Sequence, residues 1–420
     1  MAKYLLSSLL FILTPLLTNS CQPEESKERQ QTTTTMDSDL TPPTAVTKDL
    51  FAQWRSARRG KQQAERMDNP VWEWMLREEV GTYSATQHFQ LGSAFDLGPG
   101  WCSQRYGQSE TLLPDGRVIL IAGEHEDYYD PDFYIYNDVI VKNPDGSTHF
   151  YSYPEEDFTP TDFHSATLLD EQIILIGNLG YLESRRPGET LVQSLSLKDF
   201  HIRKIETKGN CPGWIGNHRT EYFSAEKKVI VSGGETFGDD GSLLENIDDW
   251  ELDLSIWTWK RLTERKWTRV EFSKADRGWM NLFEMRNAQF MEVMRKEHAS
   301  MMTEEMKTLF DSSGIEGEDD ELLGEPAEDS VFTPPEDPEV LASLYQPNLD
   351  FKEVSKESEE DYDVFQILVD DVTVRYNEKG SYLVMTVEGE LPSQVVESLV
   401  KDLKAKLSKL LKSEIQTRVY

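Results

Sequence analysis

The pattern of apolar and polar positions divides the chain into a helical beginning, a long β-rich middle and a compact end. Apolar side chains such as Trp72 and Leu76 recur at helical spacing after Asn69, which is typical of a helix start. From about Tyr83 the pattern changes to short β-branched and aromatic runs broken by Gly, Pro and Asp. We therefore expect a helical segment over residues 47–82, with an aromatic stripe packed against a neighbouring domain, and then an all-β region.

Three segments of the β-region share one order of strands and loops. Each has four short strands, the second of which is apolar and ends in glycine before a long loop, and the third strand starts around Asn or Asp in the first and third segments. If the segments start at Arg105, His164 and His218, their spacings are 59 and 54. A unit of four short strands buries little surface alone and is stabilised by stacking on the next unit, so the repeats predict sheets arranged radially.

The third segment carries these marks most fully, in Gly233-Gly234, Asp248-Asp249-Trp250, and Trp257 with Trp259. The first has Ala122-Gly123 and Phe150, and the second has Gly177-Asn178 and no Trp. Through these residues the region from about Tyr83 to Arg265 resembles the kelch repeats of a β-propeller, and the sequence around Gly123 to Asp132 resembles bacterial kelch-like proteins of unassigned role.

The resemblance implies a mainly β fold, a kelch-like propeller over residues 83–272 with flanking helices. Three repeats fall short of the usual four to eight blades. Either residues 83–98 and part of 266–272 form a diverged fourth blade, or the domain is small and partly open, so we expect three to four blades.

The segment 1–21 has the layout of a secretory signal. Lys3 precedes an apolar stretch, Tyr4 to Leu17, which is shorter than the roughly 20 residues that cross a membrane. Cys21 after a small residue resembles a bacterial lipoprotein signal, which implies a lipidated Cys21, although Thr18 stands where an aliphatic residue is usual. The alternative is an ordinary cleaved signal. Residues 22–46 predict a disordered tether, and Gln22 by resemblance favours the outer membrane, so we expect an exported envelope protein, an outer-membrane or periplasmic lipoprotein.

About half of the formal charge of −33 lies in one segment, because residues 311–363 contain 19 acidic and two basic residues. We expect a disordered acidic linker there, with a cation-attracting or partner-binding segment as the alternative. A field of this sign repels phosphate, so nucleic acid is excluded as a partner of the free chain.

Two further segments complete the organisation. Residues 273–310 form a Met-rich helical segment, for which we favour packing over peptide binding. Residues 364–420 form a small α+β domain of three strands and an amphipathic helix, which more often covers the strands than lies on a membrane.

One loop gathers most of the candidate chemistry. Its carboxylates are Glu124, Glu126, Asp127, Asp130 and Asp132, and its other candidate contacts are His125, Tyr128 and Tyr129. Hard divalent cations such as Ca²⁺ prefer several oxygen ligands, so the five carboxylates are a candidate metal site. We favour the alternative, a structural loop or one that contacts a partner.

Residues at the repeat starts form a second candidate. His164 and His218 with Arg105 and Arg219 are candidate binding residues near a propeller axis, with structural histidines as the favoured alternative. For Cys102 and Cys211 we favour free thiols over a disulfide, since equivalent places in different repeats are usually too far apart to pair.

The most consistent interpretation is a lipid-anchored propeller of the cell envelope that binds a protein or carbohydrate ligand. No catalytic residue is assigned, because no nucleophile elbow, zinc helix or phosphate-binding glycine loop is found. The alternative is a metal-assisted or carbohydrate-acting enzyme that uses residues 124–132 with His164 and His218. The cofactor is otherwise unknown. A cytosolic scaffold would require that the segment 1–21 be retained.

Overall fold

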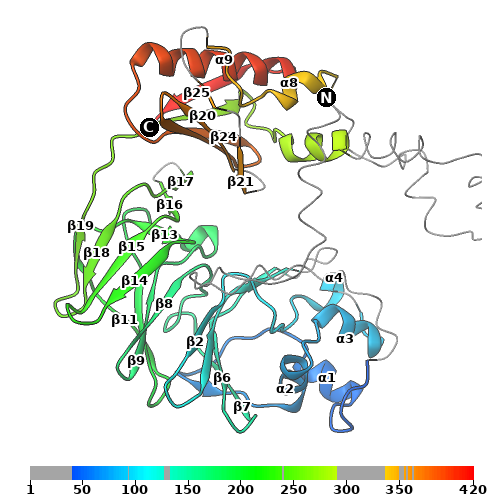
Figure 1. Cartoon of the computed structure of the whole chain (residues 1–420). Coiled ribbons are helices and arrows are strands. Elements are labelled where there is room, and N and C mark those ends of the chain that lie inside the picture. Colours follow the sequence, from blue (N-terminus) through cyan, green and yellow to red (C-terminus); the bar gives the residue numbers. More distant parts are fainter. Residues whose placement is uncertain are drawn as a thin grey trace, which may run out of the picture. The chain divides into compact units, whose positions relative to one another are not determined.

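A computed structural model describes residues 40–92, 94–126, 133–238, 241–290, 336–349, 354–355, 358–361 and 364–420. The chain divides into two compact units, Met1–Leu262 and Thr263–Tyr420 (Figure 1). The described residues are mainly β, with several antiparallel sheets and flanking helices. The predicted signal with Cys21 lies outside these residues, as does nearly all of the tether. Among the described residues, no helix is long and apolar enough to cross a membrane.

Four short helices begin the first unit. They are α1 (Lys48–Trp54), α2 (Pro70–Arg77), α3 (Thr82–His88) and α4 (Ala94–Leu97). The side chain of Asn69 accepts a hydrogen bond from the backbone N–H of Trp72 at 2.9 Å, which caps α2 as its sequence predicted. Trp72 is completely buried, so the aromatic stripe is a packing face, as expected.

Helices α3 and α4 correct the expected start of the β-region. The sequence interpretation placed β structure, and part of a fourth blade, from Tyr83 onward, whereas residues 82–88 and 94–97 are helical. The residues Thr82, Ala85 and Thr86 lie at helical spacing and are buried, which places one face of α3 in the core. Thr and aromatic residues favour strands in general, and this tertiary packing overrides that preference.

The three repeat segments each form one sheet, as expected. Sheet 1 contains β1 (Glu65–Arg66), β2 (Ser109–Leu112), β3 (Val118–Ile121), β6 (Asp138–Lys142) and β7 (Thr148–Ser152). Sheet 2 contains β8 (Ser165–Leu169), β9 (Gln172–Ile176), β10 (Val192–Ser196) and β11 (Ile202–Lys204). Sheet 3 contains β12 (Lys208–Gly209), β14 (Arg219–Phe223), β15 (Lys228–Ser232), β18 (Trp250–Asp253) and β19 (Thr258–Arg261).

Successive strands in these sheets are antiparallel, and only the short β12 pairs in parallel. Two smaller sheets accompany them. One contains β4 (Glu124–His125) and β5 (Tyr134–Ile135), and the other contains β13 (Trp214–Gly216), β16 (Glu235–Phe237) and β17 (Leu243–Glu245). The short helix η2 (Leu182–Ser184) lies between β9 and β10.

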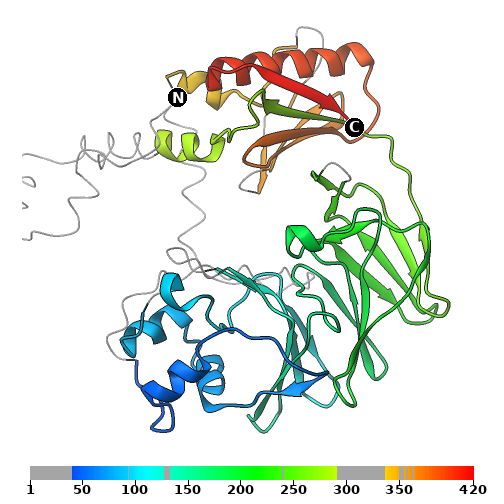
Figure 2. The ribbon, with the colours of Figure 1, turned by 180° about the vertical axis from the view of Figure 1, so that it is seen from behind.

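The three large sheets stand in a curved row, with helices α1 to α4 at the end beside sheet 1 (Figures 1 and 2). Strand β8 lies next to β2 on one side and β14 on the other, so the first strands of the sheets are neighbours. Three separate cores follow this order. Trp72 and Phe150 pack between the helices and sheet 1, Ile119 and Ile173 between sheets 1 and 2, and Ile174 and Trp259 between sheets 2 and 3.

Sheet 3 ends this row. Four consecutive residues of β9 in sheet 2 are buried, whereas burial alternates along β15, where Val229 and Val231 are buried and Ile230 is half-buried. On the outward face, Lys228 forms an ion pair with Glu251 at 3.1 Å. A strand whose residues are buried on both faces indicates a sheet that is covered on both sides. A strand along which buried and partly exposed residues alternate indicates a sheet with one covered face. No fourth sheet of the first unit covers this face within the described ranges.

The second unit is a six-stranded antiparallel sheet in the order β21-β22-β23-β24-β20-β25. Its strands are β20 (Thr268–Lys274), β21 (Ser358–Asp361), β22 (Val364–Val369), β23 (Val372–Glu378), β24 (Tyr382–Val387) and β25 (Ile415–Val419). Helix α9 (Ser393–Leu411) buries Leu399, Leu403 and Leu407 in the same core as the sheet. The expected three strands and covering helix are therefore present.

Strand β20 corrects the other half of the fourth-blade hypothesis. The sequence interpretation assigned residues 266–272 to the β-region, but β20 pairs with β24 and β25 in the second unit. Apolar Val270 and Phe272 alternate with polar Glu271 and Ser273, all four of them buried, and this alternation of residue type suits any sheet with an apolar face. The pattern therefore identifies a strand without identifying its partners.

Part of the expected acidic linker belongs to the second unit. Helix α8 (Pro338–Ala342) and the residues after it bury Leu341, Leu344 and Tyr345 in the core of that unit. Tyr345 stacks on Phe365 with ring centroids 4.8 Å apart. The acidic composition of residues 311–363 hides this short apolar set, so the prediction of disorder is wrong for residues 336–349, and also for β21, which pairs with β22. Residues 311–335 lie outside the described residues.

The Met-rich segment is described only at its beginning, where residues 282–290 are helical. Met280 and Leu282 are buried in the core of the second unit, and Met285 packs against it. This packing agrees with the favoured prediction for the described part. Residues 291–310 lie outside the described residues.

Candidate functional site

The long loops of the three large sheets all lie at one end of the row. They cover residues 122–137, 177–191 and 233–249 and connect β3 to β6, β9 to β10 and β15 to β18. Because consecutive strands are antiparallel, these loops share one end, which we call the loop end, and the short turns share the other, the turn end. The loop end is therefore where residues from three sheets can meet.

Glycines start these loops because the chain turns there beside a neighbouring segment. Gly123 and Gly177 have φ values of 90° and 80°, which L side chains rarely adopt. A Cβ atom on Gly177 would lie 2.3 Å from the carbonyl oxygen of Ile215. Gly123 and Gly177 therefore provide a positive φ, and Gly177 also permits a close backbone approach.

The described part of the acidic loop forms a small three-stranded arrangement. Glu124 pairs with Ile135 and His125 with Tyr134 in β4 and β5. The backbones of Tyr106 and Glu124 exchange two hydrogen bonds of 2.9 and 2.8 Å. Directly opposed residues of antiparallel strands present their side chains on the same face. The candidates Asp127, Tyr128, Tyr129, Asp130 and Asp132 lie outside the described residues.

Glu124 stands in an acidic environment. Burial raises the pKa of its carboxyl, and repulsion from Asp162 and Glu126 raises it further. Asp162, which sequence reasoning missed, is buried and accepts a hydrogen bond from the backbone N–H of Gly180 at 2.6 Å. Burial also raises the pKa of Asp162, while the Gly180 N–H and the charge of Arg185 oppose this rise.

Arg185 connects the second and third loops. Its Nε donates a hydrogen bond to the carbonyl oxygen of Leu179 at 3.0 Å, and its guanidinium lies 5.3 Å from the ring centre of Phe237 in β16. Arg185 also attracts Asp162 and Glu235. Sequence reasoning missed this arginine, although its position in a long loop after Gly177 was a signal.

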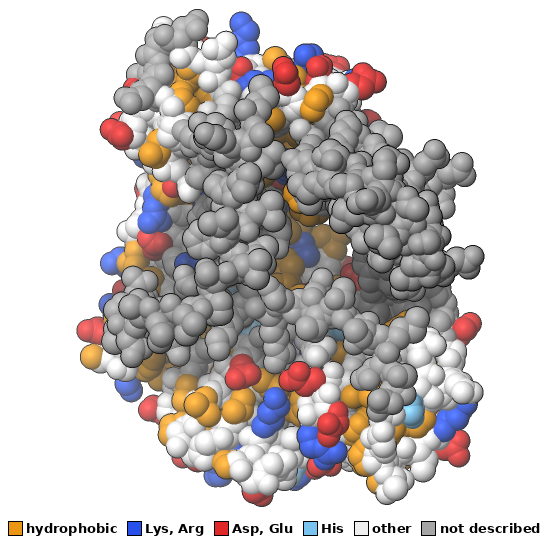
Figure 3. Space-filling model, turned by 45° about the vertical axis from the view of Figure 1, so that its right-hand side comes forward, with side chains coloured by type: hydrophobic (Ala, Val, Ile, Leu, Met, Phe, Trp, Pro, Cys, Tyr) orange, Lys and Arg blue, Asp and Glu red, His pale blue; other side chains and the backbone are white. Residues whose placement is uncertain are grey.

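Exposed aromatic and aliphatic side chains accompany these carboxylates. Tyr106, Phe133 and Leu182 are 53%, 43% and 64% exposed. Phe133 contacts Tyr181 edge to face, with centroids 5.9 Å apart, and the Tyr181 hydroxyl accepts a hydrogen bond from the Ile135 N–H at 2.9 Å. On the face drawn in Figure 3, apolar, acidic and basic side chains of the described residues are interspersed. The sequence analysis named Tyr128 and Tyr129 as aromatic contacts but missed Tyr106, Phe133, Tyr181 and Leu182, because their place at the loop end follows only from the fold.

His125 faces the interior side of β4. Its Nδ1 lies 2.9 Å from the carbonyl oxygen of Gln104, and its imidazole also forms a hydrogen bond with the Cys102 thiol. Burial raises the pKa of that thiol, but His125 and hydrogen bonds to the backbones of Gln104 and Thr82 together outweigh burial and hold the pKa below its usual range. Cys102 is completely buried and Cys211 is half-buried, and both are free thiols, as favoured.

His164 and His218 form one joint twice between consecutive sheets. The Ser109 hydroxyl lies 2.8 Å from Nε2 of His164, and the Ser165 hydroxyl lies 3.0 Å from Nε2 of His218. In sheet 1, Gln108 precedes Ser109 as each histidine precedes the first strand of its own sheet. The joints therefore support the structural alternative for both histidines.

The backbone at the joints corrects the repeat boundaries. Gly107, Phe163 and Asn217 precede Gln108, His164 and His218, and their φ values are 61°, 47° and 53°. The Phe163 N–H donates to the carbonyl oxygen of Gly107, and the Asn217 N–H donates to that of Phe163. Gln108 rather than Arg105 is thus the counterpart of the histidines, and the repeat spacings become 56 and 54.

Both histidines are held neutral. Burial lowers the pKa of His164 to about 3 and that of His218 to about 4, and the proximity of His218 lowers the value for His164 further. Nδ1 of each ring has no hydrogen-bond partner among the described residues, and Gly177 packs against the His218 ring. Neither ring presents a charged group to a ligand.

The two arginines of that candidate set do not join the histidines. Arg105 has a completely buried side chain that donates to both carboxylate oxygens of Asp138, and its guanidinium lies 3.4 Å from the ring centre of Tyr136. Arg219 is exposed in β14 of the terminal sheet. The structure therefore separates Arg105, His164, His218 and Arg219 into a core ion pair, two joints and an exposed strand position.

The candidate metal residues are only partly described. Glu124 and Glu126 lie at the loop end, and the other three carboxylates of the set are outside the described residues. Among the residues that the structure does describe, no group of three or more His, Cys, Asp or Glu side chains is placed to hold a metal ion.

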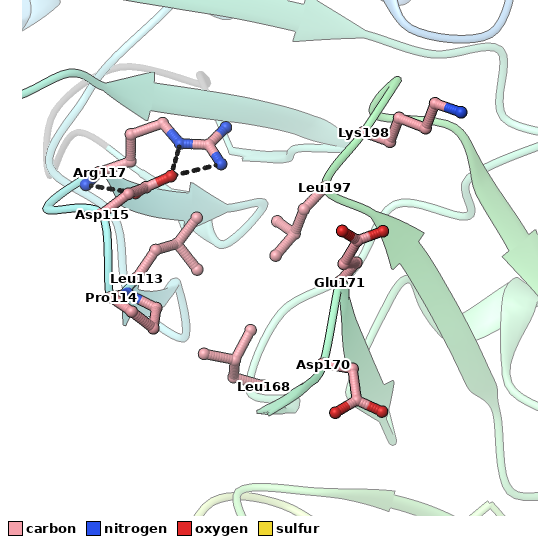
Figure 4. A pocket seen from close by; sticks show the side chains of 9 residues that line it. All are labelled: Leu113, Pro114, Asp115, Arg117, Leu168, Asp170, Glu171, Leu197 and Lys198. Carbon is pink, nitrogen blue, oxygen red and sulfur yellow. Dashed lines mark hydrogen bonds and ion pairs between the residues drawn. The ribbon is translucent and has the colours of Figure 1, made fainter.

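A cleft of about 570 Å³ lies at the turn end, between sheets 1 and 2 (Figure 4). Its apolar lining comes from Leu113, Leu168 and Leu197, and on its rim Asp115 and Arg117 form an ion pair with each other at 2.8 Å. Asp170, Glu171 and Lys198 also line this cleft, but it lies between two sheets only. We place the candidate site at the loop end because loops of all three sheets lie there.

Comparison with known proteins adds little to this geometry. No family model matches the chain, and no curated protein matches it. Among solved structures, the chain is similar to YjhT, with 15% sequence identity and a TM-score of 0.25. The match covers 39% of this chain and 52% of the YjhT chain, so it spans about half the length of that protein.

Proposed function

We propose that the protein is an exported, lipid-anchored binding module with a kelch-like, open β-propeller of three blades. Its ligand is a protein or a carbohydrate that contacts the loop end. One observation carries this proposal, namely that Tyr106, Phe133 and Leu182 are exposed beside Glu124 at the end where loops of three sheets converge. Exposed aromatic groups among polar ones are characteristic of binding surfaces.

The propeller part of the proposal is supported by the order of strands. Three sheets of antiparallel strands follow in sequence, their first strands are neighbours, and the Ser–His joint repeats at both boundaries. The polar outward face of sheet 3 favours an open row over a closed ring.

Export and lipidation are supported by the sequence of the segment 1–21. Mass spectrometry of the mature protein from bacterial membranes is expected to find an amino-terminal, lipid-modified Cys21. An unmodified Met1 would overturn the proposed location and favour a cytosolic scaffold.

Binding at the loop end is tested with a triple variant. Purified protein is applied to arrays of peptides and oligosaccharides, and Tyr106→Ala with Phe133→Ala and Leu182→Ala is expected to lose at least about tenfold in binding to any ligand found. The matched control is Leu112→Ala with Ile256→Ala, which removes apolar side chains that are 69% and 63% exposed at the turn end. Equal loss in both variants would contradict the proposal.

The second candidate function is a metal-assisted or carbohydrate-acting enzyme. The raised pKa of Glu124 and the neighbouring Asp162 favour it, because paired carboxyls are typical of acid–base or metal sites. Metal analysis of the purified protein tests the metal version. Stoichiometric metal that is lost in Asp127→Asn with Asp130→Asn would support the enzyme, and protein that binds no metal would exclude this version.

A further inference from the structure

We propose that the loop end recognises a cationic ligand, a peptide or protein segment that presents lysine or arginine side chains. This inference rests on the proposed binding function and assigns its ligand class. Four exposed or half-exposed residues carry it, the two rings of Tyr106 and Phe133 and the two carboxylates of Glu124 and Glu126.

The backbone register pairs one ring with one carboxylate, because Tyr106 and Glu124 are directly opposed across two hydrogen bonds. Glu124 also pairs with Ile135, and His125 pairs with Tyr134. Glu126 and Phe133 are the next residues beyond these two pairs, so the second carboxylate and the second ring lie beside the first. Side chains two residues apart in an extended segment share a face, so we expect Glu126 on the same side as Glu124.

The same pairing of ring and carboxylate binds arginine elsewhere in this chain. Arg105 lies between Asp138 and the ring of Tyr136, and Arg261 lies between Asp248 and the ring of Trp250, 5.6 Å from its centre. In the second unit, Arg286 contacts Glu378 and the ring of Phe365 in the same way. A carboxylate supplies charge and hydrogen bonds, and a ring face attracts the cation through its quadrupole.

The carboxylates at the loop end have no such cation among the described residues. Asp162 has Arg185 nearby, whereas neither Glu124 nor Glu126 forms an ion pair with any residue that the structure describes. Glu126 and Asp162 lie close enough to Glu124 for their carboxylates to repel that of Glu124. A bound lysine or arginine would relieve this repulsion, so charge complementarity selects a cationic partner over a neutral one.

The experiment measures binding of acetylated, amidated peptides of alternating Lys and Gly, alternating Arg and Gly, and alternating acetyl-lysine and Gly. A neutral oligosaccharide array serves as a fourth probe. We expect the cationic peptides to bind the full-length protein, and Glu124→Gln with Glu126→Gln to weaken them by about tenfold or more. Raising the salt concentration from 50 to 500 mM should weaken the wild type more than this variant.

A highly acidic protein attracts basic peptides without specificity, so the control variant removes the same charge elsewhere. Glu221→Gln with Glu226→Gln changes two exposed carboxylates of sheet 3 and its turn and should leave binding within about twofold. Circular dichroism and thermal unfolding are expected to be alike in all variants, because none of these carboxylates belongs to the buried cores.

The following results would overturn the cationic ligand alone or both proposals. Equal weakening by the two charge variants, or equal binding of acetyl-lysine peptides, would overturn the cationic ligand. Oligosaccharide binding that depends on Tyr106 and Phe133 but not on Glu124 and Glu126 would also overturn it and leave the proposed binding function intact. If no probe depends on any loop-end residue, both proposals fail.

Discussion

At the residue scale, the buried joints between sheets explain how polar side chains stabilise a β-rich core. His164 and His218 are buried, and each forms a hydrogen bond with a serine of the preceding sheet. Because each ring is buried and neutral, its contribution depends on the absence of a proton. The sequence located both histidines, but the partner serines follow only from the contact between sheets.

This dependence predicts acid sensitivity. Folding lowers the pKa of His164 to about 3 and of His218 to about 4, below the roughly 6.5 of an unfolded chain. The unfolded state therefore binds protons first, and stability falls as pH drops from about 6.5 toward 4, by up to about 1.4 kcal/mol per pH unit for each histidine. His164→Gln with His218→Gln, which copies the residue type at Gln108, should remove this slope.

Urea unfolding of the wild type and of the double variant at pH 8, 7, 6 and 5 provides the measurement. The difference in the free energy of unfolding between the wild type and the variant should be constant above pH 7. Below about pH 6.5 the wild type should lose stability relative to the variant. A difference that does not vary with pH would show that the joints tolerate protonation.

The loop-end glycines give a second prediction at this scale. Gly177→Ala would place Cβ 2.3 Å from Ile215 O and 2.6 Å from the His218 ring, at a φ of 80°. We expect a loss of roughly 3 kcal/mol or more in the free energy of unfolding. Gly146→Ala is the matched control, because Gly146 has a φ of 85° but open space around it, and should cost only about 1 to 2 kcal/mol. Similar losses would exclude close packing as the cause.

At the element scale, patterns along the chain identified most strands and the main helices. They failed where neighbours outside the segment decide the structure. Helix α3 forms in a segment of strand-like composition because Ala85 and Thr86 enter the helical core, and β20 joins a sheet whose other strands begin at Ser358 or later. Periodicity describes a face and does not identify what covers it.

Helix α8 and the residues that follow it provide a test at this scale. Leu344, in the segment expected to be disordered, is 2% exposed in the core of the second unit. Leu344→Ala should cost about 2 to 5 kcal/mol and raise the hydrogen exchange rates of β22 to β24. Glu339→Ala changes an exposed residue of α8 and should have little effect. Identical exchange in both variants would support a disordered linker instead.

At the scale of the whole molecule, the first unit is a row of sheets with two different ends. Helices α1 and α2 cover sheet 1 through Trp72 and its neighbours, and sheet 3 presents alternating polar residues outward. An apolar end would favour the addition of further sheets, and a polar end disfavours it. The ends therefore limit the number of sheets in this unit.

Two lysine substitutions test this end. Ile174→Lys places a charge in the completely buried core between sheets 2 and 3 and should prevent folding of the first unit. The side chain at position 230 faces outward between Glu221 and Glu251 in the strand register. Ile230→Lys should therefore change the free energy of unfolding by less than about 1 kcal/mol. Circular dichroism and thermal unfolding measure both. A severe effect of Ile230→Lys would indicate that another sheet covers this face.

The sequence by itself determined the features that depend on neighbours along the chain. These are the capped helix after Asn69, the fourfold strand order of each repeat, the glycines that begin the long loops, and the three strands and helix near the carboxyl end. Each follows from local propensity, periodicity or a backbone conformation that one residue type adopts easily.

Only the tertiary structure decided which distant residues meet. It placed Asp138 on Arg105, joined β20 to the second unit, ended the row at sheet 3, and brought Tyr106 beside Glu124 and Phe133 beside Tyr181. The physical reason is that these contacts depend on strand pairing and core packing between segments far apart in the chain, which a pattern within one segment does not encode.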